Sequence, residues 1–140
     1  MNAPLLAAVI GLIAPTCALA QAGDTLARPP GIEAGDATEG ARLVADRQKS
    51  LCVLCHSGPF PNPHLQGDLA PDLSGVGARL SEDQIRLRVT DMRRLNPDSL
   101  MPTYAALKAG ERVGAAWRGR PILVEQEIEH IVAYLASLKE

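Results

Sequence analysis

Residues 52–56 read Cys-Val-Leu-Cys-His, and this short stretch limits what the centre of the chain can hold. Two cysteines three positions apart can form a redox-active dithiol, supply part of a metal site, or attach a group covalently. The histidine directly after the second cysteine adds a nitrogen donor to the same turn. Each of these three chemistries makes a different demand on the rest of the sequence.

Two of the three chemistries fit the surrounding sequence poorly. A redox Cys-x-x-Cys begins a helix within an alternating pattern of strands and helices, whereas this one follows a predicted helix in a chain without a convincing strand. A structural zinc site needs four ligands, and His56 is too close in sequence to Cys55 for both to converge easily on one tetrahedral metal. Besides Cys52 and Cys55, the chain after its first twenty residues offers only His56, His64 and His130.

The third chemistry uses every residue of the motif. Cys-x-x-Cys-His is the attachment signal of c-type haem, in which two thiols form thioethers with the vinyl groups and the imidazole binds the iron. We therefore expect one covalently bound haem c, attached through Cys52 and Cys55, with His56 as the proximal axial ligand. The chain has only one Trp, two Tyr and one Phe, which is consistent with a bulky cofactor filling its centre.

The distal axial position on the iron has three candidate ligands. Met92 lies on an apolar helical stripe, where a methionine usually packs, and His64 is tethered closely to the motif. Met101 lies between Pro97 and Pro102 in a loop far enough along the chain to reach the opposite face. We expect Met101 because of this position. A thioether ligand would also raise the reduction potential, which suits electron acceptance. An iron with both axial positions filled favours electron transfer over substrate chemistry.

The N-terminal segment predicts export. An apolar run from Leu5 to about Ala14 is followed by Ala-Leu-Ala, the small-residue pattern of a secretory cleavage site. We expect residues 1–20 to be a signal peptide cleaved near Ala20 and Gln21, which implies a periplasmic protein without a permanent membrane anchor. The segment has no Lys or Arg before its apolar run, and Cys17 does not lie in a convincing lipobox.

The remaining chain predicts an arm and one helical domain. Residues 21–37 contain Pro-Pro and three glycines without periodicity, so we expect an extended N-terminal arm, followed by a single domain over 38–140. Apolar residues at helical spacing predict helices over about 38–51, 81–95 and 124–139, the first two capped by Thr38 and Ser81. Residues 57–80 and 97–121 are expected to be loops, with one turn of helix over 104–108. His130 is expected on the polar, solvated side of the last helix.

The charge distribution is uneven although the formal net charge is only -2. Basic residues gather between positions 79 and 120, which favours either an acidic partner or an ordinary solvated face. The basic residues are not interleaved with aromatic ones, so the sequence gives no indication of nucleic-acid binding.

Four segments resemble the class I cytochromes c: "CVLCH", "GDLAPDL", "MP" within a loop, and a terminal helix containing "AYLASL". The resemblance implies an all-α fold in which the N- and C-terminal helices cross, near Gly40 and Tyr134, with loops wrapped around one covalent haem. It also implies that the carbonyl of Pro71 accepts a hydrogen bond from the ring N–H of His56 and so orients the imidazole.

A closer resemblance covers most of the chain. The stretches "GDLAPDLSGVGAR", "LRVTDMRRLNPDSLMPTY" and "RVGAAWRGRPILVEQEIEHIVAYLASL" are similar to the SoxX family, the small monohaem subunits of the SoxAX cytochromes of bacterial sulfur oxidation. This resemblance implies a SoxA-like partner with one or two haems. The pair would couple thiosulfate oxidatively to a cysteine of a carrier protein, and this chain would pass the electrons to a downstream cytochrome.

By this resemblance the chain belongs to an enzyme, an L-cysteine S-thiosulfotransferase, only as its electron-accepting subunit, and alone it is an electron carrier. The N-terminal arm and residues 57–66 become candidates for contacting the SoxA-like partner. Two other functions stay open at this point. One is a free-standing periplasmic electron shuttle, and the other is a haem sensor with a labile sixth ligand.

Overall fold

The computed structural model describes residues 23–105, 114–115 and 118–140. Within them the regular secondary structure is entirely helical, which confirms the expected all-α class. The described α-helices are α1 (Ala37–Ala45), α2 (Val76–Arg79), α3 (Glu82–Asp91) and α4 (Glu125–Ser137), and the described 3-10 turns are η1 (Cys52–Leu54), η2 (Pro63–Leu65) and η3 (Met92–Arg94). The predicted signal peptide and most of the predicted turn over 104–108 lie outside the described residues.

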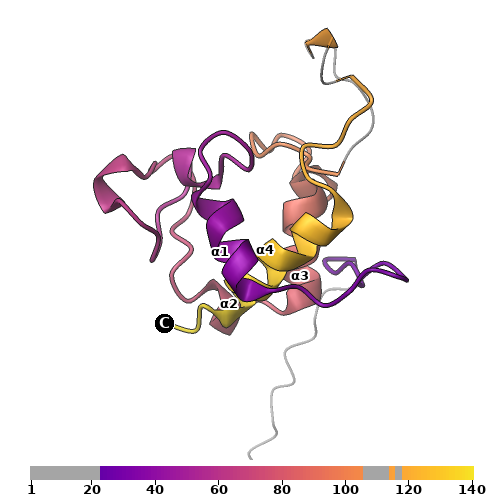
Figure 1. Cartoon of the computed structure of the whole chain (residues 1–140), viewed down its shortest axis with the longest axis horizontal. Coiled ribbons are helices and arrows are strands. Elements are labelled where there is room, and N and C mark those ends of the chain that lie inside the picture. The colour runs from indigo at the N-terminus through magenta and orange to yellow at the C-terminus, as the bar shows by residue number, and fades with distance from the viewer. Residues whose placement is uncertain (1–22, 106–113, 116–117) are drawn as a thin grey trace, which may run out of the picture.

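Helices α1 and α4 cross at a glycine (Figure 1). A Cβ atom on Gly40 would lie 1.9 Å from the carbonyl oxygen of His130 and 2.7 Å from Cβ of Tyr134. The two backbones can therefore approach this closely only because position 40 has no side chain. The crossing of the first and last helices near Gly40 and Tyr134 is thus present as the resemblance implies.

A short helix within the predicted loop 57–80 also contacts α4. A Cβ atom on Gly77 of α2 would lie 2.2 Å from the carbonyl oxygen of Ala136. The backbone of Gly77 is held at both of its polar groups, because its N–H donates to Leu138 O at 2.8 Å and its carbonyl accepts from Lys139 Nζ at 2.8 Å. The C-terminal end of the chain is thereby fixed against α2.

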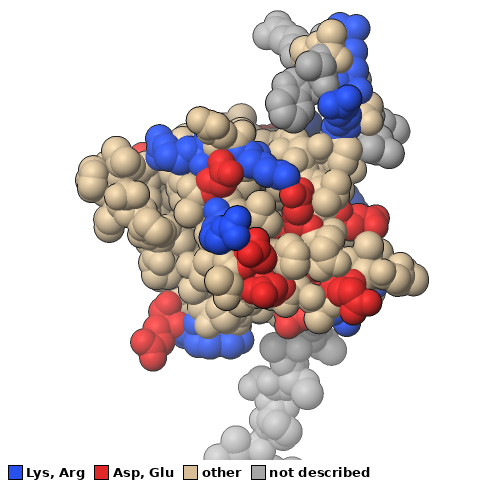
Figure 2. Space-filling view, viewed as in Figure 1, with Lys and Arg blue, Asp and Glu red and all other residues tan. Residues whose placement is uncertain are grey.

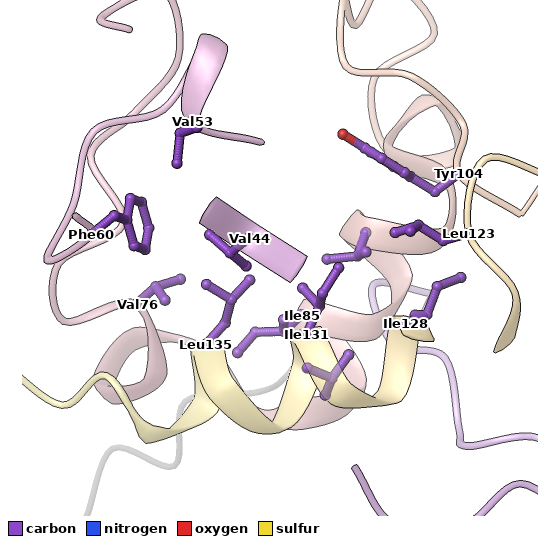
Figure 3. Close-up of a cluster of buried hydrophobic side chains, with 12 residues drawn as sticks. Val44, Val53, Phe60, Val76, Ile85, Tyr104, Leu123, Ile128, Ile131 and Leu135 are labelled. Atoms are coloured by element: carbon purple, nitrogen blue, oxygen red, sulfur yellow. The ribbon is translucent and has the colours of Figure 1, made fainter. Parts of the chain in front are cut away.

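The apolar core lies between these helices and the loops above them (Figure 3). Figure 3 shows Tyr104 and Leu123 on one side of the cluster and Val53 and Phe60 on the other, with Val44 of α1 between them. Val44 and Ile131 are fully buried, at 0% exposure. Cys52 and Met101 are half-buried and pack against the same cluster. The core therefore reaches both the motif and the methionine loop.

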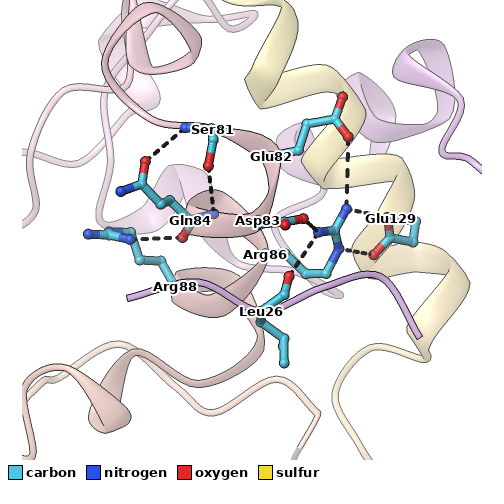
Figure 4. Close-up of polar contacts among 8 residues, drawn as sticks. All are labelled: Leu26, Ser81, Glu82, Asp83, Gln84, Arg86, Arg88 and Glu129. Carbon is cyan, nitrogen blue, oxygen red and sulfur yellow. Dashed lines mark hydrogen bonds and ion pairs between the residues drawn. The ribbon is translucent and has the colours of Figure 1, made fainter. Parts of the chain in front are cut away.

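The helix ends differ from the predictions at both ends of α1 and at the end of α3, which stops at Asp91 and is followed by the 3-10 turn η3 instead of continuing to residue 95. The N-cap of α1 is Asp36 rather than Thr38, because the Asp36 carboxylate accepts from the backbone N–H groups of Thr38 at 2.7 Å and Glu39 at 3.2 Å. Helix α1 ends at Ala45 instead of continuing towards residue 51, because Asp46 turns the chain by accepting from the N–H groups that follow it. The capping box predicted at Ser81 is confirmed (Figure 4).

A buried ion pair joins α3 to α4, and the sequence patterns did not predict it. Arg86 and Glu129 are each only 3% exposed, and the guanidinium binds both carboxylate oxygens, at 2.6 and 3.0 Å (Figure 4). The same guanidinium donates to Leu26 O at 2.9 Å and pairs with Asp83. In the sequence Arg86 stands only among the basic residues between positions 79 and 120, and Glu129 lies within the last predicted helix. Their pairing leaves neither buried charge uncompensated.

The N-terminal arm lies along α3 and α4 rather than extending into solvent. Residues 23–36 contain no helix, and Leu26 N–H donates to Asp83 O at 2.9 Å. At the other end of the arm, the backbone N–H of Asp36 donates to Nδ1 of His130 at 2.8 Å. The prediction of a merely solvated His130 is therefore wrong, because its ring fixes the arm where α1 begins. No described helix is long and apolar enough to cross a membrane.

Candidate functional site

The Cys-Val-Leu-Cys-His motif forms one tight turn. Leu51 adopts a left-handed conformation with φ of 64°, which reverses the chain into η1. The N–H groups of Cys55 and His56 then both donate to the carbonyl oxygen of Cys52, at 3.2 and 2.9 Å. The turn keeps the two thiols and the imidazole within a few residues of one another on a single compact segment.

A second segment pairs with this turn through its backbone. Gly67, Ala70 and Leu73 donate in succession to the carbonyl oxygens of Val53, Cys55 and Ser57, each at 2.9 Å. Gly67 is required for this approach, because a Cβ atom there would lie 2.1 Å from Leu54 O. These hydrogen bonds hold the stretch "GDLAPDL", residues 67–73, against the motif.

This pairing brings Pro71 to His56. Nδ1 of His56 lies 2.7 Å from the carbonyl oxygen of Pro71, the contact that the resemblance implies. A carbonyl oxygen only accepts hydrogen bonds, so Nδ1 must carry the proton. In the neutral imidazole Nε2 then carries the lone pair, which is the protonation state that an iron ligand requires. The roles of His56 as proximal ligand and of Pro71 as its orienting partner stay predictions that this geometry fits.

The two cysteines have the chemistry of an attachment site. Both are free and half-buried, and these thiols stand for the thioether sulfurs of the haem-loaded protein. Burial raises the pKa of the Cys52 thiol, whereas reactive redox dithiols have a lowered pKa. Among the described residues, no group of three or more His, Cys, Asp or Glu is gathered that could hold a metal ion. The raised pKa disfavours a redox dithiol, and Cys52, Cys55 and His56 together fit a covalently bound haem.

The three candidate distal ligands occupy different environments. Met101 is half-buried against the core cluster, and its N–H donates to Ser99 Oγ at 3.2 Å. Met92 begins η3 at the end of α3, and His64 lies exposed in η2. Of the three candidates, Met101 is the one that packs against the same apolar cluster as Cys52. Ligation by Met101 stays a prediction.

Exposed apolar side chains adjoin the motif and the methionine loop, and exposed basic residues lie elsewhere on the surface. Leu54, Leu69 and Leu100 are exposed by 41%, 69% and 80%, and the first and last of them adjoin Cys55 and Met101. Exposed basic residues Arg118 and Arg120 lie on a segment that extends away from the body of the molecule (Figures 1 and 2). Elsewhere in the predicted basic region Arg79, Arg93 and Arg94 are also exposed. Arg86 is buried, and the half-buried Arg88 lies 3.6 Å from Asp24 Oδ2.

Tyr104 is a residue of this region that the sequence patterns did not single out. It is 3% exposed, and its hydroxyl donates to the carbonyl oxygen of Ser50, two residues before Cys52. The available signal was its position, because it is one of only two tyrosines in the chain and follows the Met101-Pro102 pair directly after Thr103. Sequence reasoning had assigned it only to a turn of helix.

Comparisons with known proteins agree with this geometry. No protein-family model and no curated protein sequence matches the chain. A chain in the crystal structure of SoxXA from P. pantotrophus is 31% identical, with a TM-score of 0.75, and the match covers 84% of this chain and 92% of that one. The c-type cytochrome SorU from Sinorhizobium meliloti is 19% identical over 74% of this chain and 90% of its own, with a TM-score of 0.46. On the strength of the SoxXA match, this protein has the class I cytochrome c fold, acts in electron transfer and belongs to the SoxX family of haem c proteins.

Proposed function

We propose that this chain is the monohaem electron-transfer subunit of a periplasmic SoxAX-type complex. The observation that carries the proposal is the similarity to a SoxXA chain over 84% of this chain, joined to the His56 and Pro71 geometry. In the proposed reaction, a carrier cysteine thiol and thiosulfate form a new sulfur–sulfur bond and release one proton and two electrons. The electrons leave through this subunit, one at a time, to a downstream cytochrome.

The residues of this chain hold and orient the cofactor in this proposal. Bound haem would supply a one-electron Fe(III)/Fe(II) couple. Cys52 and Cys55 would bind it covalently, and Pro71 would keep the Nε2 lone pair of His56 directed to the iron by holding the proton on Nδ1. Met101 would fill the opposite axial position and favour the reduced state. With His56 and Met101 both holding the cofactor, the chain would need no substrate-binding residues of its own.

Reconstitution with the partner tests this function. The haem-loaded chain is copurified with a SoxA-like subunit, and haem reduction is followed by absorbance after addition of thiosulfate and the carrier protein. We expect a stable complex and reduction that depends on all three components. A chain that forms no complex but exchanges electrons rapidly with a terminal oxidase would instead be a free-standing shuttle. A reduced form that binds CO readily would indicate a sensor.

Matched methionine variants test the distal ligand. Ferric haem with a sulfur ligand has a long-wavelength charge-transfer band, which we expect in the intact protein and in Met92→Leu but not in Met101→Leu. Loss of the band in Met92→Leu alone would overturn the assignment. The attachment residues are tested in parallel, because Cys52→Ala with Cys55→Ala should abolish the haem that stays with the chain on a denaturing gel.

The maturation proposal has its own measurement. The intact mass of the protein isolated from the periplasmic fraction should correspond to a chain that begins at Gln21 and carries one haem. A mass that retains residues 1–20, or recovery only from the cytoplasm, would contradict export. A mass with an added lipid on Cys17 would contradict the absence of a membrane anchor.

A further inference from the structure

Tyr104 lies where the methionine loop meets the attachment turn. Figure 3 shows its ring entering the core from the Leu123 side, with the hydroxyl pointing towards the side that carries Val53. The hydroxyl donates to the carbonyl oxygen of Ser50, a residue that is itself 0% exposed. One side chain thus connects the loop that carries Met101 with the segment that leads into Cys52.

The backbone of Tyr104 is fixed from two further directions. Its N–H donates to Thr90 O at 3.1 Å, near the end of α3. Its carbonyl oxygen accepts from Ile122 at 2.9 Å and from Leu123 at 3.2 Å, on the segment that leads into α4. The residue before it, Thr103, donates from Oγ1 to Asp91 Oδ1 at 3.0 Å. These hydrogen bonds hold the backbone of Tyr104 in place, and with it the end of the loop that begins three residues earlier at Met101.

The hydroxyl matters more when the cofactor is attached. In the free-thiol form Cys52 Sγ lies 3.8 Å from Ser50 O and can act as a weak donor to it. A thioether sulfur has no proton to donate, so among the described residues Tyr104 is left as the donor to this buried carbonyl. Burial raises the pKa of the Tyr104 phenol, which keeps the hydroxyl protonated and able to donate.

We propose that Tyr104 is a positioning residue, whose hydrogen bond to Ser50 sets how firmly the Met101 loop is held over the cofactor attached at Cys52. This inference rests on the proposed ligation by Met101. Ser50 extends the connection into the scaffold, because its hydroxyl donates to Leu43 O in α1. The position of the distal ligand is thereby coupled to the first helix through two hydroxyl groups.

The experiment compares two matched variants of the haem-loaded protein, Tyr104→Phe and Tyr134→Phe. Each substitution removes one hydroxyl and keeps the ring. The Tyr134 hydroxyl is the control because it makes only a long contact, of 3.5 Å, and makes it with Pro59 O rather than with Ser50. Free imidazole is titrated into the oxidised protein, where it competes with Met101 for the iron. Loss of the charge-transfer band reports the displacement, and the reduction potential is measured on the same samples.

We expect imidazole to bind Tyr104→Phe about three- to tenfold more tightly than the intact protein, the factor that one net hydrogen bond corresponds to. The reduction potential should fall, because a less firmly held thioether stabilises the reduced state less. Tyr134→Phe should change neither quantity. Equal imidazole affinity in all three proteins would overturn the inference, as would an effect of the same size in both variants.

A second measurement applies if Tyr104→Phe does not accumulate with haem. In Tyr134→Phe, Tyr104 is the only tyrosine left, so growth with 3-fluorotyrosine labels that position alone. Its fluorine resonance should shift when imidazole displaces Met101, and an unchanged resonance would overturn the inference. A charge-transfer band absent from the intact protein would overturn Met101 ligation together with this inference, while leaving thiosulfate-dependent reduction as a separate test of the proposed function.

Discussion

The helix crossing and the attachment site are held by different kinds of interaction. At the crossing, Val44 and Ile131 are fully buried and the backbones of α1 and α4 touch at Gly40. At the site, Cys52, Cys55, His56 and Met101 are only half-buried, and the chain around them is ordered by hydrogen bonds to backbone carbonyls. The crossing is therefore held by close packing of side chains and backbones, whereas the chain around the motif is held mainly by backbone hydrogen bonds.

The two regions also differ in how each uses a histidine ring. His56 donates from Nδ1 to Pro71 O, which leaves the Nε2 lone pair available to a ligand. His130 accepts at Nδ1 from the N–H of Asp36, so in its neutral form the proton is on Nε2. The same residue type thus leaves Nε2 available for the predicted ligand role at the site, whereas at the crossing it joins two segments of the scaffold.

A side chain at Gly40 should give the largest effect, because it breaks the crossing directly. In Gly40→Val the new Cβ would meet the His130 carbonyl at 1.9 Å, and a backbone atom cannot move aside as a flexible side chain can. We expect a loss of about 5 kcal/mol or more in the free energy of unfolding, measured by urea denaturation. Arg42→Ala on the exposed face of the same helix is the control and should change little.

Removing the buried arginine should give the next largest effect. Arg86→Met leaves Glu129 as an uncompensated buried charge, for which we expect a loss of about 3–5 kcal/mol. The double variant with Glu129→Leu should recover most of this loss, since no charge is then left buried. If the double variant is as unstable as the single one, the loss comes from the missing hydrogen bond between Arg86 and Leu26 O rather than from the unpaired charge of Glu129.

On the site side, a single polar side chain organises the loop after the motif. Gln66 accepts from Gly58 N–H and donates to Phe60 O, both at 2.9 Å. We expect Gln66→Ala to cost about 1–2 kcal/mol locally, seen as faster proteolysis between residues 57 and 66. Gln48→Ala, at an exposed position, should leave the cleavage rate unchanged. A large fall in Tm would show that this loop supports the scaffold and would weaken the contrast.

The smallest effect is expected from titrating the N-cap of α1. The backbone N–H groups of Glu39 and Thr38 lower the pKa of Asp36 below its ordinary value of 3.8. The charged carboxylate therefore stabilises the fold above about pH 4, and this contribution is lost as the pH falls through the lowered pKa. The Tm difference between the intact protein and Asp36→Asn should shrink over that acidic range. A difference independent of pH would mean that the charge of the cap does not matter.

Much of the scaffold could be predicted because its signals are local. The apolar spacing of α4 and the Ser81 capping box each depend on residues within a few positions of one another. The motif at 52–56 likewise predicts covalent haem attachment from five contiguous residues. The predicted helix at 38–51 is too long, because Asp46 ends α1 by accepting hydrogen bonds from the backbone N–H groups of Gln48 and Lys49, which helical spacing does not reveal.

The contacts that were missed join distant parts of the chain. Arg86 lies three positions before Val89, and Glu129 three before Val132, so both charges adjoin the apolar stripe of their helix. That placement was a signal, but their pairing depends on the packing of α3 against α4. The close approach of α2 to α4 at Gly77 and the bond from Tyr104 to Ser50 likewise arise only once the chain has folded.

The crossing at Gly40 also makes the stability of α1 depend on α4. Asp36 and His130, which join α1 to α4, are 94 residues apart in the sequence. Helix α1 therefore lacks its main packing partner until α4 is also in place, so we expect the two helices to become stable together. A truncation within α4 should destabilise α1 as well, although the two helices lie at opposite ends of the described domain.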